Sequence, residues 1–455
     1  MAKVEPAPDS FDFSVETLIV GAGACGLVAA LAAKEAGQEV LVIEADAVPQ
    51  GSTALSAGLI PAAGTRFQAE AGIADDAERF ADDIQAKAKN ENDRALVAAL
   101  ASGSGPAVEW LADRYHLPFS VVHDFDYPGH SRRRMHGLPS RSGRELIDRL
   151  RSTAESEGID IICERRVETL YRDNRRVLGV AMRRPDGGIE TVGCAKLVLA
   201  CNGFGGNREM VSRHMPDIAD AVWFGHDGNR GEAMIWGEAL GAATRHMGAY
   251  QGHGNVAQPH GILITWAVIT EGGIQVNQSG HRFWDESQGY SEAARAVLAQ
   301  PGGVAWSIFD ARIAGIARQF EDFRQAEAQG AIQQADTPEA LAAKLGLPAK
   351  ALASELKDLP RTGTDSFGRN WTGQALSPPF CAVKVTGALF HTQGGLDTDT
   401  QGRVRDSAGQ VFPNLLAAGG AACGVSGTGD SGYLSGNGLL AAIVLGRSAG
   451  MSPVQ

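Results

Sequence analysis

A glycine-rich turn between an apolar strand and an apolar helix constrains this chain most. Residues 16–20 predict a buried strand, and the turn that follows carries three glycines in the spacing GxGxxG, at Gly21, Gly23 and Gly26. A helix over 27–37 and a second strand over 39–44 complete a strand–helix–strand unit. This order of elements is typical of a dinucleotide-binding fold, whereas the glycines alone would also fit a structural turn.

The same unit carries the chemistry that a dinucleotide needs. Backbone N–H groups at the start of the helix, together with the helix dipole, attract a pyrophosphate. Glu44 stands at the end of the second strand, where a carboxylate can accept hydrogen bonds from both ribose hydroxyls. Strand, glycines, helix and acid together therefore predict a bound dinucleotide.

The bulk composition narrows the range of partners. The 455 residues allow two domains, or one with an insertion, and the 53 acidic and 41 basic side chains give a net charge of −12. That balance argues against nucleic acid and against an anionic membrane surface. The six cysteines show neither metal-ligand nor disulfide-framework spacing. No signal peptide is visible, and glycines interrupt the apolar run 18–33. We therefore expect a cytoplasmic protein without membrane insertion.

Three later segments favour FAD over NAD. Residues 51–58 place hydroxyls after the second strand, 197–204 read as a strand that returns to the dinucleotide, and 414–420 lead to a helix from Gly438. Such a helix directs its N-terminal N–H groups at the N1/O2 edge of a reduced flavin. The candidate cofactor-binding residues are Gly21, Gly23, Ala24, Gly26, Glu44, Ser52, Thr53, Ser56, Gly58, Val167, Asn202, Gly203, Gly419, Asn437, Gly438 and Leu439.

The remaining patterns predict an α/β fold with an insertion. Helical periodicity covers 77–115 and 143–158, and strand-like stretches follow at 159–163, 167–171, 177–183 and 196–200. The stretch 247–376 lacks strand–helix alternation and carries Ala- and Gln-rich helical runs at 313–329 and 338–356. We expect a Rossmann-like FAD-binding domain (GR2-type) over 1–246 and 377–455, with an inserted α+β capping and substrate domain over 247–376.

Several motifs together resemble the fumarate reductase/succinate dehydrogenase flavoprotein superfamily. They are the opening fingerprint, 271–286, 379–385, 391–396 and the C-terminal glycine block. The resemblance is to the soluble branch with 3-ketosteroid Δ1-dehydrogenases, tricarballylate dehydrogenases and 4-oxocyclohexanecarboxylate desaturase-type enzymes. Ser52 stands where membrane-complex members carry the histidine that is covalently bound to FAD, so we expect non-covalent FAD. Gly420 replaces a family glutamate, and Cys201-Asn202 replaces the usual Thr-Gly.

One position distinguishes two chemistries within this superfamily. Fumarate reductases use an arginine as the acid after a Gly-x-Arg-Phe-x-x-Glu stretch, and counting from Gly280 the equivalent residue is Tyr290. Ketosteroid dehydrogenases carry a tyrosine there, which removes a proton alpha to a carbonyl. The resemblance implies that Tyr290 is a catalytic base; the structural alternative is a buried aromatic residue near the cofactor.

The resemblance also implies a site for the enolate oxygen. Residues 433–438 are similar to a Tyr-Pro-Gly-x-Gly stretch whose tyrosine hydroxyl and a backbone N–H four residues later hold the ketone oxygen, here Tyr433 and Asn437. His391 falls where fumarate reductases have a substrate-binding histidine. The structural alternatives are a turn tyrosine packed on the flavin and a histidine that fixes the loop before Gly394.

Other candidates rest on weaker patterns. The basic cluster 130–137 offers Arg132 and Arg134 for a substrate carboxylate, although a solvated loop is the commoner outcome. Trp266 and Phe283 could wall a pocket for an apolar ring, or pack in the core. Arg282 is expected to be structural and paired with Glu286.

These patterns predict FAD-dependent α,β-desaturation of a cyclic ketone. A small oxo ring such as 4-oxocyclohexanecarboxylate fits the small cap better than a steroid does, and a 3-ketosteroid-like substrate stays open. The alternatives are redox chemistry on a di- or tricarboxylate, an electron-transfer subunit that docks on an iron–sulfur partner, and a non-catalytic flavin-binding protein. Oxygen, a quinone and an electron-transfer protein all stay open as electron acceptor.

Overall fold

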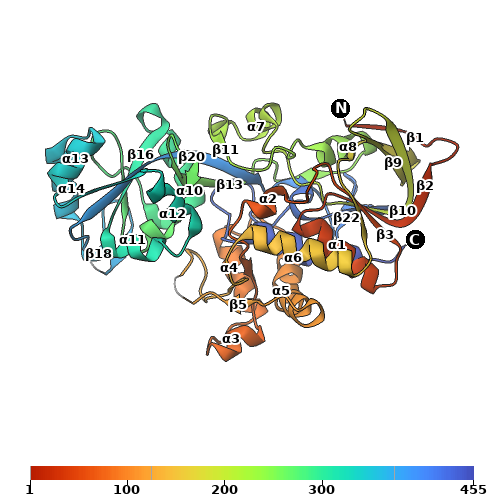
Figure 1. Ribbon diagram of the computed structural model, residues 1–455, viewed down its shortest axis with the longest axis horizontal. Helices are drawn as coiled ribbons and strands as arrows, with labels where there is room; N and C mark the ends of the chain where they lie inside the picture. Colours follow the sequence, from red (N-terminus) through yellow and green to blue (C-terminus); the bar gives the residue numbers. More distant parts are fainter. Residues whose placement is uncertain (1, 124–125, 374, 455) are drawn as a thin grey trace.

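A mixed sheet with a parallel centre, flanked by helices, forms the first half of the architecture (Figure 1). The structure is a computed structural model that describes residues 2–123, 126–373 and 375–454. The nine-stranded sheet has the order β1-β8-β9-β10-β2-β3-β7, with β23 paired to β10 and β22 paired to β23. Its strands are β1 (Lys3–Pro6), β2 (Phe13–Val20), β3 (Val40–Ile43), β7 (Asp160–Ile162), β8 (Arg166–Asp173), β9 (Arg176–Arg183), β10 (Ile189–Leu199), β22 (Arg403–Arg405) and β23 (Val411–Ala417).

The parallel register at the centre of this sheet brings distant segments together. Leu18 of β2 lies between Leu41 of β3 and Leu197 of β10, and β10 pairs in parallel with β23 near the C-terminus. The centre is buried on both faces, which accounts for the continuous apolar runs in these strands. The carboxyl ends of β2, β3, β10 and β23 therefore meet at one edge.

This half of the molecule also contains helices. They are α1 (Ala24–Glu35), α2 (Gly51–Ala54), α3 (Arg66–Glu70), α4 (Ala77–Lys87), α5 (Arg94–Tyr115), α6 (Gly143–Ser156), α7 (Arg208–His214), α8 (Glu232–Leu240) and α15 (Asn437–Met451). α1 and α15 run side by side, and a Cβ on Gly450 would lie 2.2 Å from the Ala29 carbonyl oxygen. The two helices can approach this closely only because that position is glycine.

Two sequence predictions in this half need correction. The first helix begins at Ala24 rather than at residue 27, because Gly23 is its N-cap and the third glycine of the motif lies inside the helix. The helical stretch 77–115 is two helices, since the Asp93 carboxylate accepts the N–H groups of Ala95 and Leu96 and starts α5 anew.

Among the described residues, α5 is the one helix long and apolar enough to cross a membrane by length and composition. Its apolar face is buried between α4 and α15, and Pro106 lies inside it. This packing is that of a core helix.

A second, seven-stranded sheet lies beside the first half (Figure 1). Its main order is β14-β13-β20-β16-β15, and β11 and β17 also pair with β20. The strands are β11 (Val222–Trp223), β13 (Tyr250–Ala257), β14 (Ile262–Leu263), β15 (Ile274–Val276), β16 (Val304–Asp310), β17 (Ile332–Ala335) and β20 (Phe380–Thr392). β20 is thus the centre of this sheet, although it follows the 247–376 segment in sequence. The proposed domain boundaries stay a prediction.

Short helices surround the second sheet. They are α9 (Ala267–Thr270), α10 (Tyr290–Leu298), α11 (Ala311–Ala317), α12 (Glu321–Ala328), α13 (Pro338–Leu345) and α14 (Ala349–Asp358). The two long helical runs predicted here are each two helices: Phe320 precedes α12 in an extended conformation, and Gly346 ends α13 in the left-handed region. Small sheets join β12 (Thr244–Arg245) to β21 (Gly395–Leu396), β18 (Thr362–Thr364) to β19 (Asn370–Thr372), and β4 (Ile60–Pro61) and β5 (Ser120–Val121) to β6 (Met135–Gly137).

A buried ion network stabilises the start of α10. Arg282 donates to Glu286 (Nε to Oε1, 2.9 Å) and to Asp365, and Arg369 donates to the same Glu286 at 3.2 Å. The pairing expected for Arg282 and Glu286 is present. Because all four side chains are almost fully buried and satisfied by one another, this network is structural.

Candidate active site

A cavity of about 730 Å³ lies between the two sheets, at the carboxyl ends of β2, β3 and β10. It is the place where ligands bind in folds of this type. The sequence-predicted residues that line it are Gly21, Gly23, Ala24, Glu44, Ser52, Thr53, Ser56, Gly58, Val167, Asn202, Gly419, Gly438, Leu439, Trp266, Tyr290, His391 and Tyr433. Those that do not line it are Gly26, Gly203, Asn437, Arg132, Arg134 and Phe283.

The glycine fingerprint shapes one end of the cavity. Gly21 has φ +104°, and a Cβ on Gly26 would lie 1.8 Å from the Gly21 carbonyl oxygen. Gly26 therefore acts through close packing of helix against turn. Gly23 is the N-cap of α1 and makes no side-chain cap bond, and Gly23, Ala24 and Cys25 at this helix start line the cavity. This end has the backbone donors that a pyrophosphate requires.

Glu44 is held at the tip of β3 by backbone donors. Its carboxylate accepts the N–H of Ala22 at 2.7 Å and the N–H of Asp46 at 2.9 Å. These two bonds leave further lone pairs on a side chain that lines the cavity and is 9% exposed. The carboxylate is therefore fixed where the ribose of a dinucleotide would lie.

Replacing Glu44 by glutamine is expected to weaken FAD binding by roughly 30-fold, or about 2 kcal/mol, because a charged acceptor is exchanged for a neutral one. Titration of the apoprotein with FAD, followed by quenching of flavin fluorescence, measures this. Glu39→Gln, at the exposed start of the same strand region, is the matched control and should bind FAD like the wild type.

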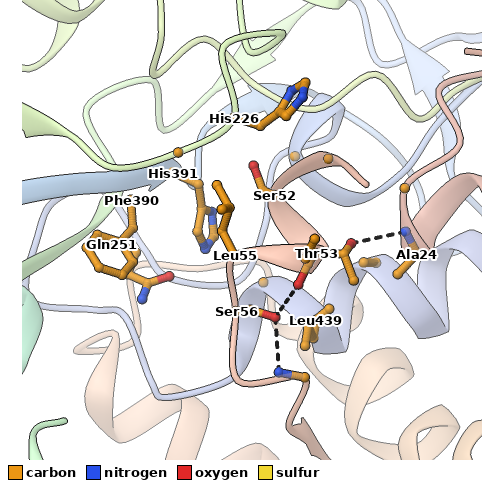
Figure 2. A pocket seen from close by; sticks show the side chains of 18 of the residues that line it. Ala24, Ser52, Thr53, Leu55, Ser56, His226, Gln251, Phe390, His391 and Leu439 are labelled. Atoms are coloured by element: carbon orange, nitrogen blue, oxygen red, sulfur yellow. Dashed lines mark hydrogen bonds between the residues drawn. The ribbon is translucent and has the colours of Figure 1, made fainter. Parts of the chain in front are cut away.

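Hydroxyl side chains line the next part of the cavity (Figure 2). Thr53 Oγ1 accepts the N–H of Ala24 at 3.1 Å, and Ser56 donates to the Thr53 carbonyl at 2.7 Å. Ser52 Oγ accepts from the side-chain amides of Asn202 and Asn229 at 3.0 and 3.1 Å. Asn202 takes φ +67°, and Oδ1 of its side chain accepts the N–H of Gly203. These bonds fix the polar wall in advance of any ligand.

The start of α15 forms the opposite wall. Its N-cap, Gly436, has φ +87° and makes no side-chain cap bond, and Gly438 and Leu439 face the cavity. The expectation for Asn437 needs correction, because its N–H donates to the Leu434 carbonyl at 3.0 Å and its side chain is fully buried against Ser426. The backbone of Gly438 and Gly436 acts on the Tyr433 hydroxyl and lowers its pKa, against the larger effect of burial.

Two tyrosines from different halves face each other across this wall. Tyr290 is the first residue of α10, Tyr433 lies in the loop before α15, and their rings meet edge to face at 6.2 Å. Burial raises the pKa of Tyr290 well above 10.0 and that of Tyr433 to about 12; bonds with Ser435 and with the Gly438 and Gly436 backbone act in the opposite direction. Both phenols are therefore neutral donors at pH 7.

His391 closes the same end of the cavity (Figure 2). Its Nδ1 lies 3.1 Å from the Thr392 carbonyl oxygen and 3.0 Å from the Gln393 amide nitrogen. Its ring meets Tyr433 edge to face at 5.6 Å, and a Cβ on Gly438 would lie 2.7 Å from its Nε2. Burial lowers the pKa of His391, so the imidazole is neutral at pH 7.

The two arginines predicted to bind a carboxylate lie outside the cavity. The Arg134 side chain is fully buried and donates to Asp75 at 2.9 Å and to Asp83. Arg132 is exposed and donates to the carbonyls of Ala74 and Ser131. Phe283 packs in the core of the second half, whereas Trp266 lines the cavity as predicted.

Several lining residues were not predicted from the sequence. Gln251 and His253 alternate on one face of β13, and Phe390 comes from β20 (Figure 2). The His253 ring stacks on Tyr290 at 4.8 Å, and burial lowers the pKa of His253 to about 3. The period-2 pattern of residues 250–257 was a usable signal, but it indicates a strand face only once the strand is recognised. Tyr127 and Arg141 also line the cavity.

Among the described residues, no group of three or more His, Cys, Asp or Glu side chains could hold a metal ion. The donor set fits FAD instead: backbone N–H groups at two helix starts, a fixed carboxylate at a strand tip, and hydroxyls between them.

Comparison with known proteins agrees with this geometry. The FAD binding domain family matches residues 16–439. A probable fumarate reductase, Ifc3, of Shewanella frigidimarina (strain NCIMB 400) is 32% identical over 96% of this chain and 74% of its own length. A 4-oxocyclohexanecarboxylate 2-dehydrogenase of Sinomonas cyclohexanicum is 25% identical over 96% of this chain and 93% of its own.

Two solved structures share the architecture. The open conformation of a flavocytochrome c3 fumarate reductase superposes with a TM-score of 0.81 at 31% identity, covering 97% of this chain and 78% of that one. The 3-ketosteroid-Δ4-(5α)-dehydrogenase from Rhodococcus jostii RHA1 gives a TM-score of 0.76 at 25% identity, covering 97% of both chains. The chain therefore belongs to the FAD binding domain family, as an FAD-dependent oxidoreductase of the fumarate reductase superfamily that acts on CH–CH bonds.

Proposed function

We propose that this protein desaturates a cyclic ketone between the carbons α and β to its carbonyl. The observation that carries the proposal is the pair of tyrosine hydroxyls, Tyr290 and Tyr433, at one end of the cavity beside the start of α15. FAD, when bound, would accept the β-hydrogen with its electron pair. Tyr290, in its phenolate form, would take the α-hydrogen as a proton and become the neutral phenol, so the ketone loses two hydrogens and two electrons in all.

The developing enolate oxygen needs donors that are already in place. The Tyr433 hydroxyl supplies one, and the dipole at the start of α15 adds a partial positive charge. His391 adds a neutral imidazole at the same place. Tyr433, Tyr290, His391 and His253 are uncharged at pH 7, which suits a neutral carbonyl better than a dicarboxylate.

A small ring carrying a carboxylate suits the rest of the lining. Trp266 and Phe390 offer apolar faces to the cavity, and Arg141 offers a cation. The Arg141 charge lowers the pKa of the neighbouring Tyr127, against the larger effect of burial. The relative from Sinomonas cyclohexanicum, named for 4-oxocyclohexanecarboxylate, supports that substrate class, and the Rhodococcus jostii structure supports a larger oxo ring. We propose 4-oxocyclohexanecarboxylate as the first compound to test.

Redox chemistry on a dicarboxylate is the second candidate. The 32% identity to a probable fumarate reductase favours it, and this is higher than the identity to the ketone dehydrogenase. It needs cations beside both carboxylates. The resemblance places Tyr290 where those enzymes carry an arginine, and Arg132 and Arg134 lie outside the cavity. The arginines that do line it are Arg141, Arg144, Arg165 and Arg166, of which Arg165 and Arg166 pair with Glu190 and Glu232.

Anaerobic reduction of the bound flavin separates the two candidates. The purified holoenzyme is mixed with a 3-ketosteroid, cyclohexanone, 4-oxocyclohexanecarboxylate or succinate, and loss of the oxidised flavin band is followed. The proposal expects a cyclic ketone to bleach the flavin and succinate to leave it oxidised. Bleaching by succinate alone would instead favour the dicarboxylate reaction.

The rate should rise with pH. The base form of Tyr290 is the phenolate, and burial places its pKa well above 10.0, so the deprotonated fraction increases tenfold per pH unit throughout the neutral and alkaline range. We expect log(kcat/KM) for the ketone to climb with a slope near one and no plateau below about pH 9. A flat profile would exclude Tyr290 as a base.

Replacing Tyr433 by phenylalanine should lower the rate of flavin reduction by about 10²-fold, because one preformed donor to the enolate oxygen is lost. The ring packing against Tyr290 and His391 is retained. Stopped-flow reduction with a saturating ketone measures this, and an unchanged FAD content shows that the cofactor site is intact.

We also propose that FAD is held without a covalent bond, because Ser52 supplies a hydroxyl that is already bonded by two amides. Acid precipitation tests this directly. All of the yellow colour should pass into the supernatant, and colour retained in the protein pellet would overturn the proposal.

A further inference from the structure

Lys87 reaches from the FAD-binding half to the start of α10. It is the last residue of α4, and its ammonium donates to the Gln288 carbonyl at 2.8 Å and to the Glu292 carboxylate. These two partners lie two residues before and two residues after Tyr290. A single side chain thus joins both flanks of the proposed base.

The backbone beside Tyr290 depends on this contact. Gly289 is the N-cap of α10, with φ +132° and no side-chain cap bond. A Cβ there would lie 3.0 Å from Glu292 Oε2 and 3.6 Å from Lys87 Nζ, so the ion pair fills the space next to the cap. Lys87 does not cap the helix, because an ammonium only donates; it ties the Gln288 carbonyl before the cap to the Glu292 carboxylate in the first turn.

The ion pair of Lys87 and Glu292 is buried, so water screens its charges only weakly. The Lys87 side chain is 15% exposed and that of Glu292 5%, and Glu292 Oε2 has no hydrogen-bond partner. Removing the lysine would leave a buried carboxylate two residues from Tyr290. The other titratable groups around the two residues are Asp430 near Glu292, and Tyr127, Tyr433 and His253 near Tyr290.

We propose that Lys87 is a positioning residue for Tyr290: it fixes the start of α10 and neutralises the Glu292 charge beside the phenol. The inference rests on the proposed role of Tyr290 in ketone desaturation. Burial is the main cause of the raised pKa of Tyr290, and the Glu292 carboxylate raises that pKa further; Lys87 pairs with Glu292 and offsets its charge. Both geometry and charge therefore link Lys87 to the base.

The first test follows Tyr290 without any substrate. The holoenzyme is produced with 3-fluorotyrosine in place of its six tyrosines, each of which gives a ¹⁹F signal. The signal that is lost in Tyr290→Phe belongs to Tyr290. Lys87→Met should shift this signal and raise the pH at which it titrates by about one unit. Glu292→Gln should lower the pH at which it titrates. Lys87→Arg should keep the wild-type signal. If Lys87→Met does not fold, the opposite shift in Glu292→Gln still tests the proposal.

Arg295→Met is the matched control. Arg295 lies one turn further along α10 and pairs with Asp430, so it makes a similar contact away from Tyr290, with a side chain 51% exposed. In Arg295→Met, the Tyr290 signal and the pH at which it titrates should match those of the wild type. The inference would be overturned if the Tyr290 signal in Lys87→Met and in Glu292→Gln matched that of the control.

Kinetics separate this inference from the proposed function. With 4-oxocyclohexanecarboxylate, Lys87→Met should lower kcat by about 10²-fold with KM nearly unchanged, as expected for a displaced base. Flavin reduction that persists in Tyr290→Phe would defeat the proposed function itself. An inactive Tyr290→Phe beside a fully active Lys87→Met would defeat only the role of Lys87.

Discussion

Replacing Tyr290 by phenylalanine is expected to lower the rate of ketone-driven flavin reduction by about 10³-fold, because the substitution removes the only atom that can take the α-proton in the proposed reaction. The ring itself stays, together with its stacking on His253 and its edge-to-face contact with Tyr433. The shape of the cavity and the FAD content should therefore be unchanged. Stopped-flow reduction under anaerobic conditions measures the rate.

The matched control is Tyr171→Phe on β8, a tyrosine that does not line the cavity. It removes a phenol of the same kind, and it should reduce the flavin at the wild-type rate. A Tyr290→Phe enzyme that keeps more than a tenth of the wild-type rate, with normal FAD content, would contradict the assignment of Tyr290 as the base.

Replacing Gly26 by valine should give a protein without flavin. The first added carbon would lie 1.8 Å from the Gly21 carbonyl oxygen, and this oxygen belongs to the backbone of the turn, so it cannot move without opening the phosphate end of the cavity. We expect a loss of about 3 kcal/mol in the free energy of unfolding and an FAD content near zero after purification. The ratio of flavin to protein absorbance and a thermal melt measure both.

Gly315→Ala serves as the control for this substitution. Gly315 lies inside α11, and nothing would come within 4 Å of its new Cβ. Alanine is also the better helix former, so this variant should keep its flavin and melt at or above the wild-type temperature. A Gly26→Val protein that holds a full complement of FAD would show that the close approach of helix and turn is not required.

The FAD-binding half was largely predictable because its signals are local. The glycines, the apolar strands and Glu44 each lie within a short stretch, and the period of the pattern reports the element directly. The start of α1 was misplaced by three residues because a GxGxxG turn and the first turn of its helix overlap: Gly23 is the cap, and Gly26 belongs to the helix.

The second half was less predictable because its pairing is non-local. β20 pairs with β13, β16 and β17, which precede it by widely different distances in the chain, and no local pattern specifies this order. Short helices lie between its buried strands in the sequence, so a search for alternating strands and helices of ordinary length did not identify these strands.

The site itself divides in the same way. Tyr290 and Tyr433 were identified from motifs, but which backbone N–H is available beside them depends on a loop bond, that from Asn437 to the Leu434 carbonyl. Arg134 looked like a ligand for an anion, and it is neutralised by Asp75 and Asp83, which come from a different segment. Such ion pairs between distant segments, like that of Lys87 with Glu292, require the folded arrangement.

We propose that Tyr290 and the flavin together remove two hydrogens from a ring ketone. The most direct measurement is a single anaerobic turnover of the holoenzyme with 4-oxocyclohexanecarboxylate, in which the flavin spectrum and the mass of the organic product are followed together. We expect a bleached flavin and a product two hydrogens lighter, both absent in Tyr290→Phe. A flavin that stays oxidised with every ring ketone, but is reduced by succinate, would contradict it.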